Sequence, residues 1–117
     1  MILGTVNYMS PEQLREQPID ARTDIWSLGV MLHEMVTGVT PFEAATPNDT
    51  IAIILEKHPT RLDFFPAEVP QAFRQVIAKT LSKKRSERYA SMSEVSSELR
   101  QLRRHAGNGA AGSAWQG

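Results

Sequence analysis

The segment from Thr23 to Thr37 constrains the fold more than any other part of the chain. Its apolar residues are spread around almost the whole circumference of a helix instead of along one stripe. A helix with that distribution is typically buried on nearly all sides. Gly38 follows at the position of a C-terminal cap. Gly29, in the middle, costs about 1 kcal/mol relative to alanine, which indicates a close backbone contact there. We therefore predict a central helix around which the rest of the fold packs.

The remaining pattern predicts further helices and no strand, so the chain is expected to be mainly α. Capping residues, or apolar residues at helical spacing, identify each of these helices. They are predicted to start after Ser10, to start after Thr46, to span Pro70 to Leu81, and to span Ser91 to about Arg104. Residues 105–117 are rich in Gly and Ala and are predicted to form a flexible tail. The folded unit is therefore expected to cover residues 1–104.

The charge balance argues against a protein dedicated to nucleic acids. The 117 residues contain 13 Lys and Arg against 13 Asp and Glu, for a formal net charge of zero. The charges are unevenly placed, because residues 79–105 carry eight basic side chains and three acidic ones. The basic last helix could contact nucleic acid, but such a run of charges is more commonly a helix face exposed to solvent. Nucleic-acid binding is therefore kept only as a remote hypothesis, behind the two stated below. We expect no nucleic-acid partner.

Several other classes of protein are excluded or disfavoured by what the sequence lacks. There is no cysteine, which excludes disulfide scaffolds, cysteine-ligated zinc and thiol catalysis. The three histidines are too scattered to predict a metal site. No apolar run approaches the ~20 residues of a membrane span, and the start does not resemble a signal peptide. We therefore expect a soluble, cytoplasmic chain without a membrane segment.

Two groups of charged residues stand out before any family is considered. Asp24 lies at the start of the central apolar helix, where the helix dipole and backbone N–H groups stabilise a carboxylate. The alternative is that Asp24 is an ordinary N-terminal cap. Glu12 and Arg88 are candidates for a bidentate ion pair, although spacing alone does not distinguish this pairing from others in the chain.

Four segments, in order, resemble the large lobe of protein kinases over roughly residues 2–104. The run from Gly4 to Glu12 resembles the end of an activation segment, with Ser-Pro-Glu in place of Ala-Pro-Glu. The run from Asp24 to Val30 is similar to the helix F signature of that family. The other two segments are Thr37 to Phe42 and the arginine-containing linker from Arg85 to Tyr89. The run Tyr-Met-Ser-Pro-Glu-Gln is similar to that of bacterial serine/threonine kinases of the eukaryotic type.

The resemblance implies a fold and a role for each matching position. The fold would be the helical C-terminal subdomain of the large lobe, from the loop that receives the substrate to the final helix. Thr5 and Glu34 would position the substrate, Thr5 in that loop and Glu34 where some kinases attract basic residues. The other positions would be structural: the Glu12–Arg88 salt bridge, Asp24 as acceptor for the catalytic loop, and Trp26, Met31 and Met35 in the helix F support.

The family's chemical machinery does not occur in these 117 residues. Phosphoryl transfer uses a Gly-rich loop, a lysine on the phosphates, a catalytic His-Arg-Asp loop and an Asp-Phe-Gly that holds magnesium. We therefore expect no catalytic or metal-binding residue in the chain and no bound cofactor, although the resemblance implies ATP and Mg²⁺ for the intact kinase. The expected partners are protein substrates or an upstream kinase segment.

Whether the chain acts as an enzyme is open at this point. The first hypothesis is a fragment of a serine/threonine kinase that is inactive by itself. The alternative is a non-catalytic protein-interaction module derived from a kinase lobe. Because the helices that enclose helix F in the family are missing here, one side of Trp26, Met31 and Met35 is expected to face water, and the isolated chain is expected to be only marginally stable.

Overall fold

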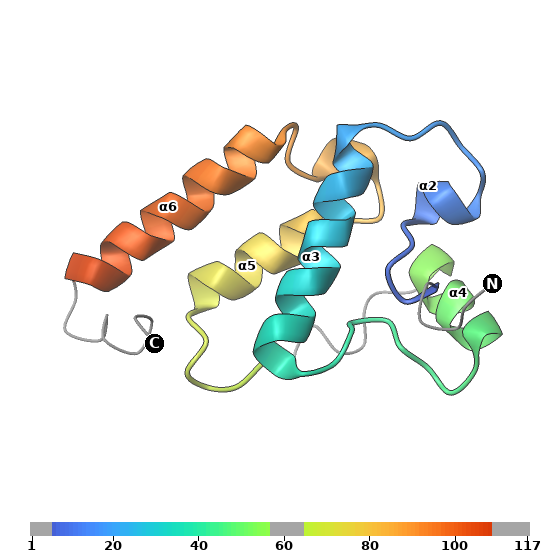
Figure 1. Ribbon diagram of the computed structural model, residues 1–117, viewed down its shortest axis with the longest axis horizontal. Helices are drawn as coiled ribbons and strands as arrows, with labels where there is room; N and C mark the ends of the chain where they lie inside the picture. Colours follow the sequence, from blue (N-terminus) through green and yellow to red (C-terminus); the bar gives the residue numbers. More distant parts are fainter. Residues whose placement is uncertain (1–5, 57–64, 109–117) are drawn as a thin grey trace.

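The computed structural model describes residues 6–56 and 65–108 of the chain, and these residues form helices joined by turns and loops, with no strand. The mainly α prediction is therefore confirmed for the described residues. Figure 1 shows α3 in the middle, with α5 and α6 on one side of it and α2 and α4 on the other. The elements are α2 (Pro11–Leu14), α3 (Ala21–Thr37), α4 (Pro47–Glu56), α5 (Gln71–Thr80), the 3-10 helix η1 (Arg85–Glu87) and α6 (Met92–Asn108).

The local capping signals set most helix ends. The capping box predicted at the start of α2 is present, because Ser10 accepts from the backbone of Gln13 and the Gln13 side chain accepts from the Ser10 backbone. At the end of α3, Gly38 adopts a left-handed conformation with φ of 85°. The helix α6 continues to Asn108, four residues beyond the predicted end at Arg104.

The start of α3 differs from the prediction. The helix begins at Ala21, not at Thr23, because the Asp20 carboxylate accepts a hydrogen bond from the Arg22 backbone N–H at 2.9 Å. Asp20 is therefore the N-cap, and the interpretation of Asp24 as an ordinary cap is wrong. Asp24 lies inside the first turn of α3.

Two clusters of buried side chains join the helices. The larger one connects α3, α4 and α5 with the loop before α4, and the smaller one connects α3, α5 and α6. The larger cluster contains Val6, Trp26, Val30, Phe42, Ile54, Phe73, Ile77 and Leu81. The smaller contains Ile25, Val76, Tyr89 and Val95. Because Trp26 and Ile25 are neighbours on α3, this one helix contributes to both clusters.

The central helix has buried residues in both core clusters, but one stripe of its surface, with Asp24, Met31 and Met35, is exposed. Burial on nearly all sides, as the pattern predicts, is therefore not reached among the described residues. Trp26 is fully buried, which also contradicts the expectation that one side of it faces water. Met31 and Met35 are 51% and 76% exposed, as expected. The helix α3 therefore has more apolar surface than the other described helices cover.

Gly29 lies where α3 crosses α5, which confirms the predicted close contact. A Cβ at this position would lie 2.0 Å from Thr80 Oγ1 and 2.8 Å from Thr80 Cβ. The neighbour is thus a side chain whose own backbone belongs to α5. Rotation of the Thr80 side chain moves the hydroxyl but leaves its Cβ in place.

We predict that Gly29→Ala lowers the free energy of unfolding by about 1–3 kcal/mol through overpacking, although alanine is the better helix former. Urea denaturation measures the change. In the double variant Gly29→Ala/Thr80→Ala, the hydroxyl contact is gone, so the loss should be smaller than the sum of the single losses by at least about 0.5 kcal/mol. Strict additivity of the two losses would contradict this explanation.

Candidate functional site

Glu12 and Arg88 form a buried, bidentate ion pair between residues 76 positions apart in the chain. Glu12 is the second residue of α2, and Arg88 follows η1. Arg88 Nη1 donates to Glu12 Oε2 at 2.7 Å, and Arg88 Nη2 donates to Glu12 Oε1 at 2.9 Å. Only 2% of Glu12 and 4% of Arg88 is exposed. The structure therefore brings together the two residues that the sequence left as one possible pairing.

Further hydrogen bonds saturate this pair. Thr23 Oγ1 donates to Glu12 Oε2 at 2.8 Å. Arg88 Nε donates to the Ser82 carbonyl at 2.7 Å, and Arg88 Nη1 donates to the Arg22 carbonyl at 3.0 Å. A buried ion pair is stable only when its remaining donors and lone pairs are satisfied in this way. Arg88 therefore joins α2, the first turn of α3 and the segment between α5 and η1 at one point.

The ion pair sets the protonation of Glu12. Burial by itself would raise the pKa of this carboxyl, but hydrogen bonds from Arg88, from the backbone and from Thr23 outweigh it. Together they lower the pKa of Glu12 to about 2. Glu12 is therefore ionised, and the pair fully charged, at neutral pH.

We predict that acid weakens the fold through Glu12. The folded-state pKa of this carboxyl lies below its unfolded value of 4.5, so its contribution to stability is present above pH 4.5 and is lost as the pH falls toward 2. The loss amounts to at most about 3 kcal/mol. Urea denaturation between pH 5 and pH 2.5 should show this slope in the natural chain and a shallower one in Glu12→Gln. Glu68→Gln, at an exposed position, is the control and should keep the natural slope.

Trp26 packs directly beside the ion pair. Its ring stacks on Phe42 with 5.1 Å between ring centroids and 8° between planes. The Arg88 guanidinium lies 5.0 Å from the Trp26 ring centroid, in the range of a cation–π contact. The indole Nε1 is buried and has no hydrogen-bond partner among the described residues. Trp26 thus connects the ion pair to the larger core cluster.

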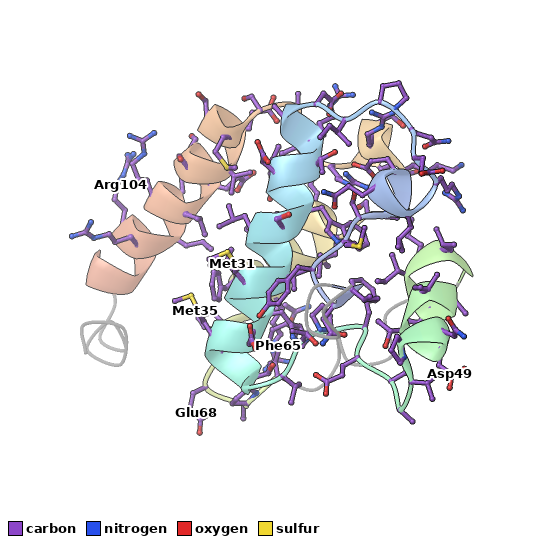
Figure 2. The ribbon with its side chains drawn as sticks, turned by 45° about the vertical axis from the view of Figure 1, so that its right-hand side comes forward. Met31, Met35, Asp49, Phe65, Glu68 and Arg104 are labelled. Atoms are coloured by element: carbon purple, nitrogen blue, oxygen red, sulfur yellow. The ribbon has the colours of Figure 1, made fainter. Side chains whose placement is uncertain are left out.

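One face of α3 carries an acid and two methionines that the described helices leave uncovered. The Asp24 side chain is exposed and makes no hydrogen bond or ion pair with the described residues. Met31 and Met35 follow seven and eleven positions later, which places all three on one side of the helix. Figure 2 shows Met31 and Met35 projecting from α3 on the side toward α6. We call Asp24, Met31 and Met35 the open face of α3.

Glu34 lies near the other end of α3 and accepts a hydrogen bond from the Tyr8 hydroxyl. This bond raises the pKa of Tyr8, and burial and the nearby charges of Glu34 and Glu43 act in the same direction. The contact connects the segment before α2 to the central helix. Thr5, the other residue predicted to position a substrate, lies outside the described residues.

Two partners of the candidate residues, Tyr8 and Thr23, are not predicted by the sequence pattern. Tyr8 belongs to the run that resembles an activation segment, and its place in that run could have identified it as a candidate. Thr23 lies directly before Asp24, but nothing in the local sequence indicates that its hydroxyl reaches Glu12, eleven residues away.

The described residues contain no group of three or more His, Asp or Glu side chains that could hold a metal ion. No helix among them combines the length and the apolar character needed to cross a membrane.

The candidate site has three parts: the buried Glu12–Arg88 ion pair, the aromatic stack beside it and the open face of α3.

The protein kinase domain model matches residues 1–100 of this chain. A probable serine/threonine-protein kinase of Clostridium acetobutylicum is 34% identical over 98 residues. The serine/threonine-protein kinase PksC of Streptomyces coelicolor is 34% identical over 98 residues. The serine/threonine-protein kinase PknB of Mycolicibacterium smegmatis is 34% identical over 106 residues.

These alignments cover most of this chain but a small part of each relative. They include 84% of the chain for the Clostridium and Streptomyces kinases and 91% for the Mycolicibacterium kinase. The same alignments cover 15%, 18% and 17% of those three relatives. The chain therefore spans less than one fifth of the length of the relatives it matches.

Proposed function

The chain belongs to the protein kinase domain family, and from this premise we propose that residues 1–104 form the C-terminal part of the large lobe of a serine/threonine kinase. This part positions the protein substrate and supports the catalytic loop. The intact enzyme would transfer a phosphoryl group from ATP, with Mg²⁺, to serine or threonine residues of proteins.

The buried Glu12–Arg88 pair is the observation that carries this proposal. Both residues stand at the positions where the kinase resemblance expects its salt bridge, in the Ser-Pro-Glu run and in the linker before the last helix. With distances of 2.7 Å and 2.9 Å, the pair holds α2, which directly follows the segment that contains Tyr8, and Arg88 also bonds the Arg22 carbonyl at the start of α3. Such a rigid attachment suits a segment that must hold a substrate in one orientation.

The open face of α3 supports the second half of the proposal. Exposed apolar side chains that share one side of a helix are typical of a contact surface. Met31 and Met35 are 51% and 76% exposed, and Asp24 is exposed at the same side of the helix. In the proposed arrangement the methionines pack under the catalytic machinery, and the Asp24 carboxylate accepts backbone hydrogen bonds from the catalytic loop.

We propose that Thr5 and Glu34 position the protein substrate. Glu34 carries a negative charge near the Tyr8 hydroxyl, and Glu43 is close enough to influence the same tyrosine. A substrate with a basic side chain would find a favourable potential there. Thr5 follows Gly4 in the run that resembles the substrate loop, so we place it beside the residue that follows the phosphoacceptor.

The phosphoryl transfer itself must use residues other than these 117, because the family's motifs for binding ATP and magnesium do not occur among them. We therefore propose that the chain alone is inactive. The enzymatic activity would belong to an intact kinase in which this chain forms one part.

A chimeric kinase tests the proposal. Residues 1–104 replace the aligned segment in the Mycolicibacterium smegmatis relative, and transfer of phosphate from labelled ATP to a protein substrate is measured. We expect the chimera to be active and the 117-residue chain alone to be inactive. Asp24→Ala should reduce the activity of the chimera by about a hundredfold, since a displaced catalytic loop costs about that much. The matched control, Asp49→Ala on the exposed start of α4, should leave the activity unchanged.

Methionine oxidation provides a second readout of the same chimera. Hydrogen peroxide should oxidise Met31 and Met35 rapidly in the chain alone and slowly in the chimera, where the open face is covered. A folded but inactive chimera with freely oxidised methionines would contradict the proposal. It would instead favour the alternative, a non-catalytic module that uses the open face of α3 to bind another protein.

A further inference from the structure

Three methionines that are exposed among the described residues lie on two helices that run in the same general direction. Met31 and Met35 belong to the open face of α3, and Met92, the first residue of α6, is 40% exposed. Figure 1 shows α3 and α6 starting at the same end of the molecule, and Figure 2 shows Met31 and Met35 projecting toward α6. Large apolar side chains gathered on one surface are typical of an interaction site.

The spacing along α6 repeats that of the open face of α3. The three residues of the open face are separated by seven and then four positions, and the same intervals separate Met92, Leu99 and Arg103. Residues with this spacing share one side of a helix. Met92 and Arg103 are exposed, and Leu99 is half-buried against both core clusters. We call Met92, Leu99 and Arg103 the α6 stripe.

The α6 stripe lies on the flank of α6 that faces away from α5. Burial raises the pKa of Tyr89, and the charges of Glu98 and Glu94 raise it further, which places both carboxylates near this ring. The Lys79 ammonium, on α5, lies 4.6 Å from the centroid of the same ring. The two glutamates therefore mark the α5 side of α6, and the stripe is about 140° around the helix from them. Since α6 packs against both α5 and α3, the stripe lies on the side of α3.

The open face and the α6 stripe carry opposite charges at opposite ends. Asp24 lies in the first turn of α3, and Arg103 lies in the second half of α6. Neither side chain forms an ion pair with the described residues. Met31 and Leu99 lie between these charges along the two helices. A surface that is negative at one end, apolar in the middle and positive at the other end is complementary to itself after a two-fold rotation.

We propose that the open face of α3 and the α6 stripe together form the contact between two copies of this chain. In this two-fold dimer, Asp24 of each copy lies opposite Arg103 of the other, and the apolar side chains pack together. The net charge of zero leaves no overall repulsion to oppose association. Because few side chains form the contact, we expect a weak dimer, half formed at about 10–100 µM chain.

The inference does not rest on the proposed function. In an intact kinase the catalytic machinery would cover the same face, so the second copy and that machinery would exclude each other. The dimer therefore belongs to the chain while its open face is free.

Sedimentation velocity of the 117-residue chain tests the dimer. Between about 5 and 500 µM chain we expect a shift from monomer to mostly dimer. Met31→Gln/Met35→Gln should raise the dissociation constant at least about tenfold, because it removes the apolar centre of the contact while glutamine remains a good helix former. Circular dichroism checks that this variant folds. A natural chain that is still monomeric at the highest concentration would overturn the proposal.

Charge reversal tests whether Asp24 faces Arg103 of the other copy. Asp24→Lys and Arg103→Glu each place like charges opposite each other twice in the dimer, so each should raise the dissociation constant at least about tenfold. Asp24→Lys/Arg103→Glu restores opposite charges and should return the constant to within about threefold of the natural value. No recovery in this double variant would overturn the proposed pairing.

Two matched variants control for the change in charge alone. Asp49→Lys also reverses an acid in the first turn of a helix, and Arg104→Glu reverses an exposed cation of α6 that projects away from α3 in Figure 2. Both should leave the dissociation constant unchanged. If either weakens the dimer as much as Asp24→Lys does, the contact lies elsewhere and the proposal is wrong.

Methionine oxidation identifies any other occupant of the open face. The initial rate at which excess hydrogen peroxide oxidises Met31 and Met35 should fall as the chain concentration rises, and should not change with concentration in Asp24→Lys. In dilute solution both methionines should react rapidly. Protection that is equal at every concentration and disappears when residues 109–117 are deleted would show that the chain's own tail covers the face, and would overturn the proposal.

Discussion

Arg88→Met is expected to lower the free energy of unfolding by about 3–5 kcal/mol, the usual cost of removing one partner of a buried ion pair. Methionine fills much of the space beside Trp26 but cannot donate a hydrogen bond to Glu12. The Glu12 carboxylate would then remain buried with only the Thr23 hydroxyl and the backbone as partners. The Ser82 and Arg22 carbonyls would also lose the hydrogen bonds that Arg88 donates. Urea denaturation at neutral pH measures the loss.

Two variants show whether the loss arises from the buried pair. In Glu12→Gln/Arg88→Met the stranded charge is gone, so the double variant should be more stable than Arg88→Met alone. Arg85→Met is the matched control, since Arg85 forms a solvent-accessible ion pair with Asp20 at 3.7 Å and donates to the Pro18 carbonyl at 2.8 Å. It should cost less than about 1 kcal/mol. Similar losses from Arg85→Met and Arg88→Met would contradict the importance given to burial.

The sequence predicted those features that depend on neighbouring residues. Ser10 and Gln13 cap α2 because their side chains reach backbone groups three positions away. Gly38 ends α3 because a left-handed residue suits glycine. The start of α3 was misplaced because Asp20 and Asp24 are both acceptable caps, and only the three-dimensional path of the chain selects Asp20.

The candidate site depends on contacts between distant residues, and there the sequence was weaker. Glu12 and Arg88 are 76 positions apart, and without the kinase resemblance the sequence offers their ion pair only as one possible pairing among others. No pattern pointed to the hydrogen bond between Tyr8 and Glu34, or to the contact of Lys83 with the end of α4. Such pairs depend on how the helices cross, and helix periodicity does not determine that crossing.

The burial of Trp26 is a second feature that depends on how the helices pack and that the sequence did not predict. The sequence predicts that one side of Trp26, Met31 and Met35 faces water, which is wrong for Trp26 and confirmed for the two methionines. The structure covers Trp26 with Phe42 and Arg88 and leaves Met31 and Met35 exposed. The larger ring, which gains most from burial, lies inside, and the more adaptable methionines lie outside.

Trp26→Ala is therefore expected to lower the free energy of unfolding by about 3–5 kcal/mol. The substitution removes a fully buried ring, its stacking on Phe42 and the surface under the Arg88 guanidinium. Because the cavity opens beside the Glu12–Arg88 pair, the loss should combine with that of Arg88→Met in a non-additive way. Urea denaturation of the two single variants and the double variant measures this coupling.

Trp26→Phe separates packing from hydrogen bonding at this position. Phenylalanine keeps an aromatic ring on Phe42 and removes the indole N–H, which has no partner among the described residues. Losing an unsatisfied buried donor offsets part of the smaller ring's lost contact area. Trp26→Phe should therefore cost less than about 1.5 kcal/mol, well below the cost of Trp26→Ala. If the two substitutions cost the same, the indole N–H and not the stacked ring would be what stabilises this part of α3.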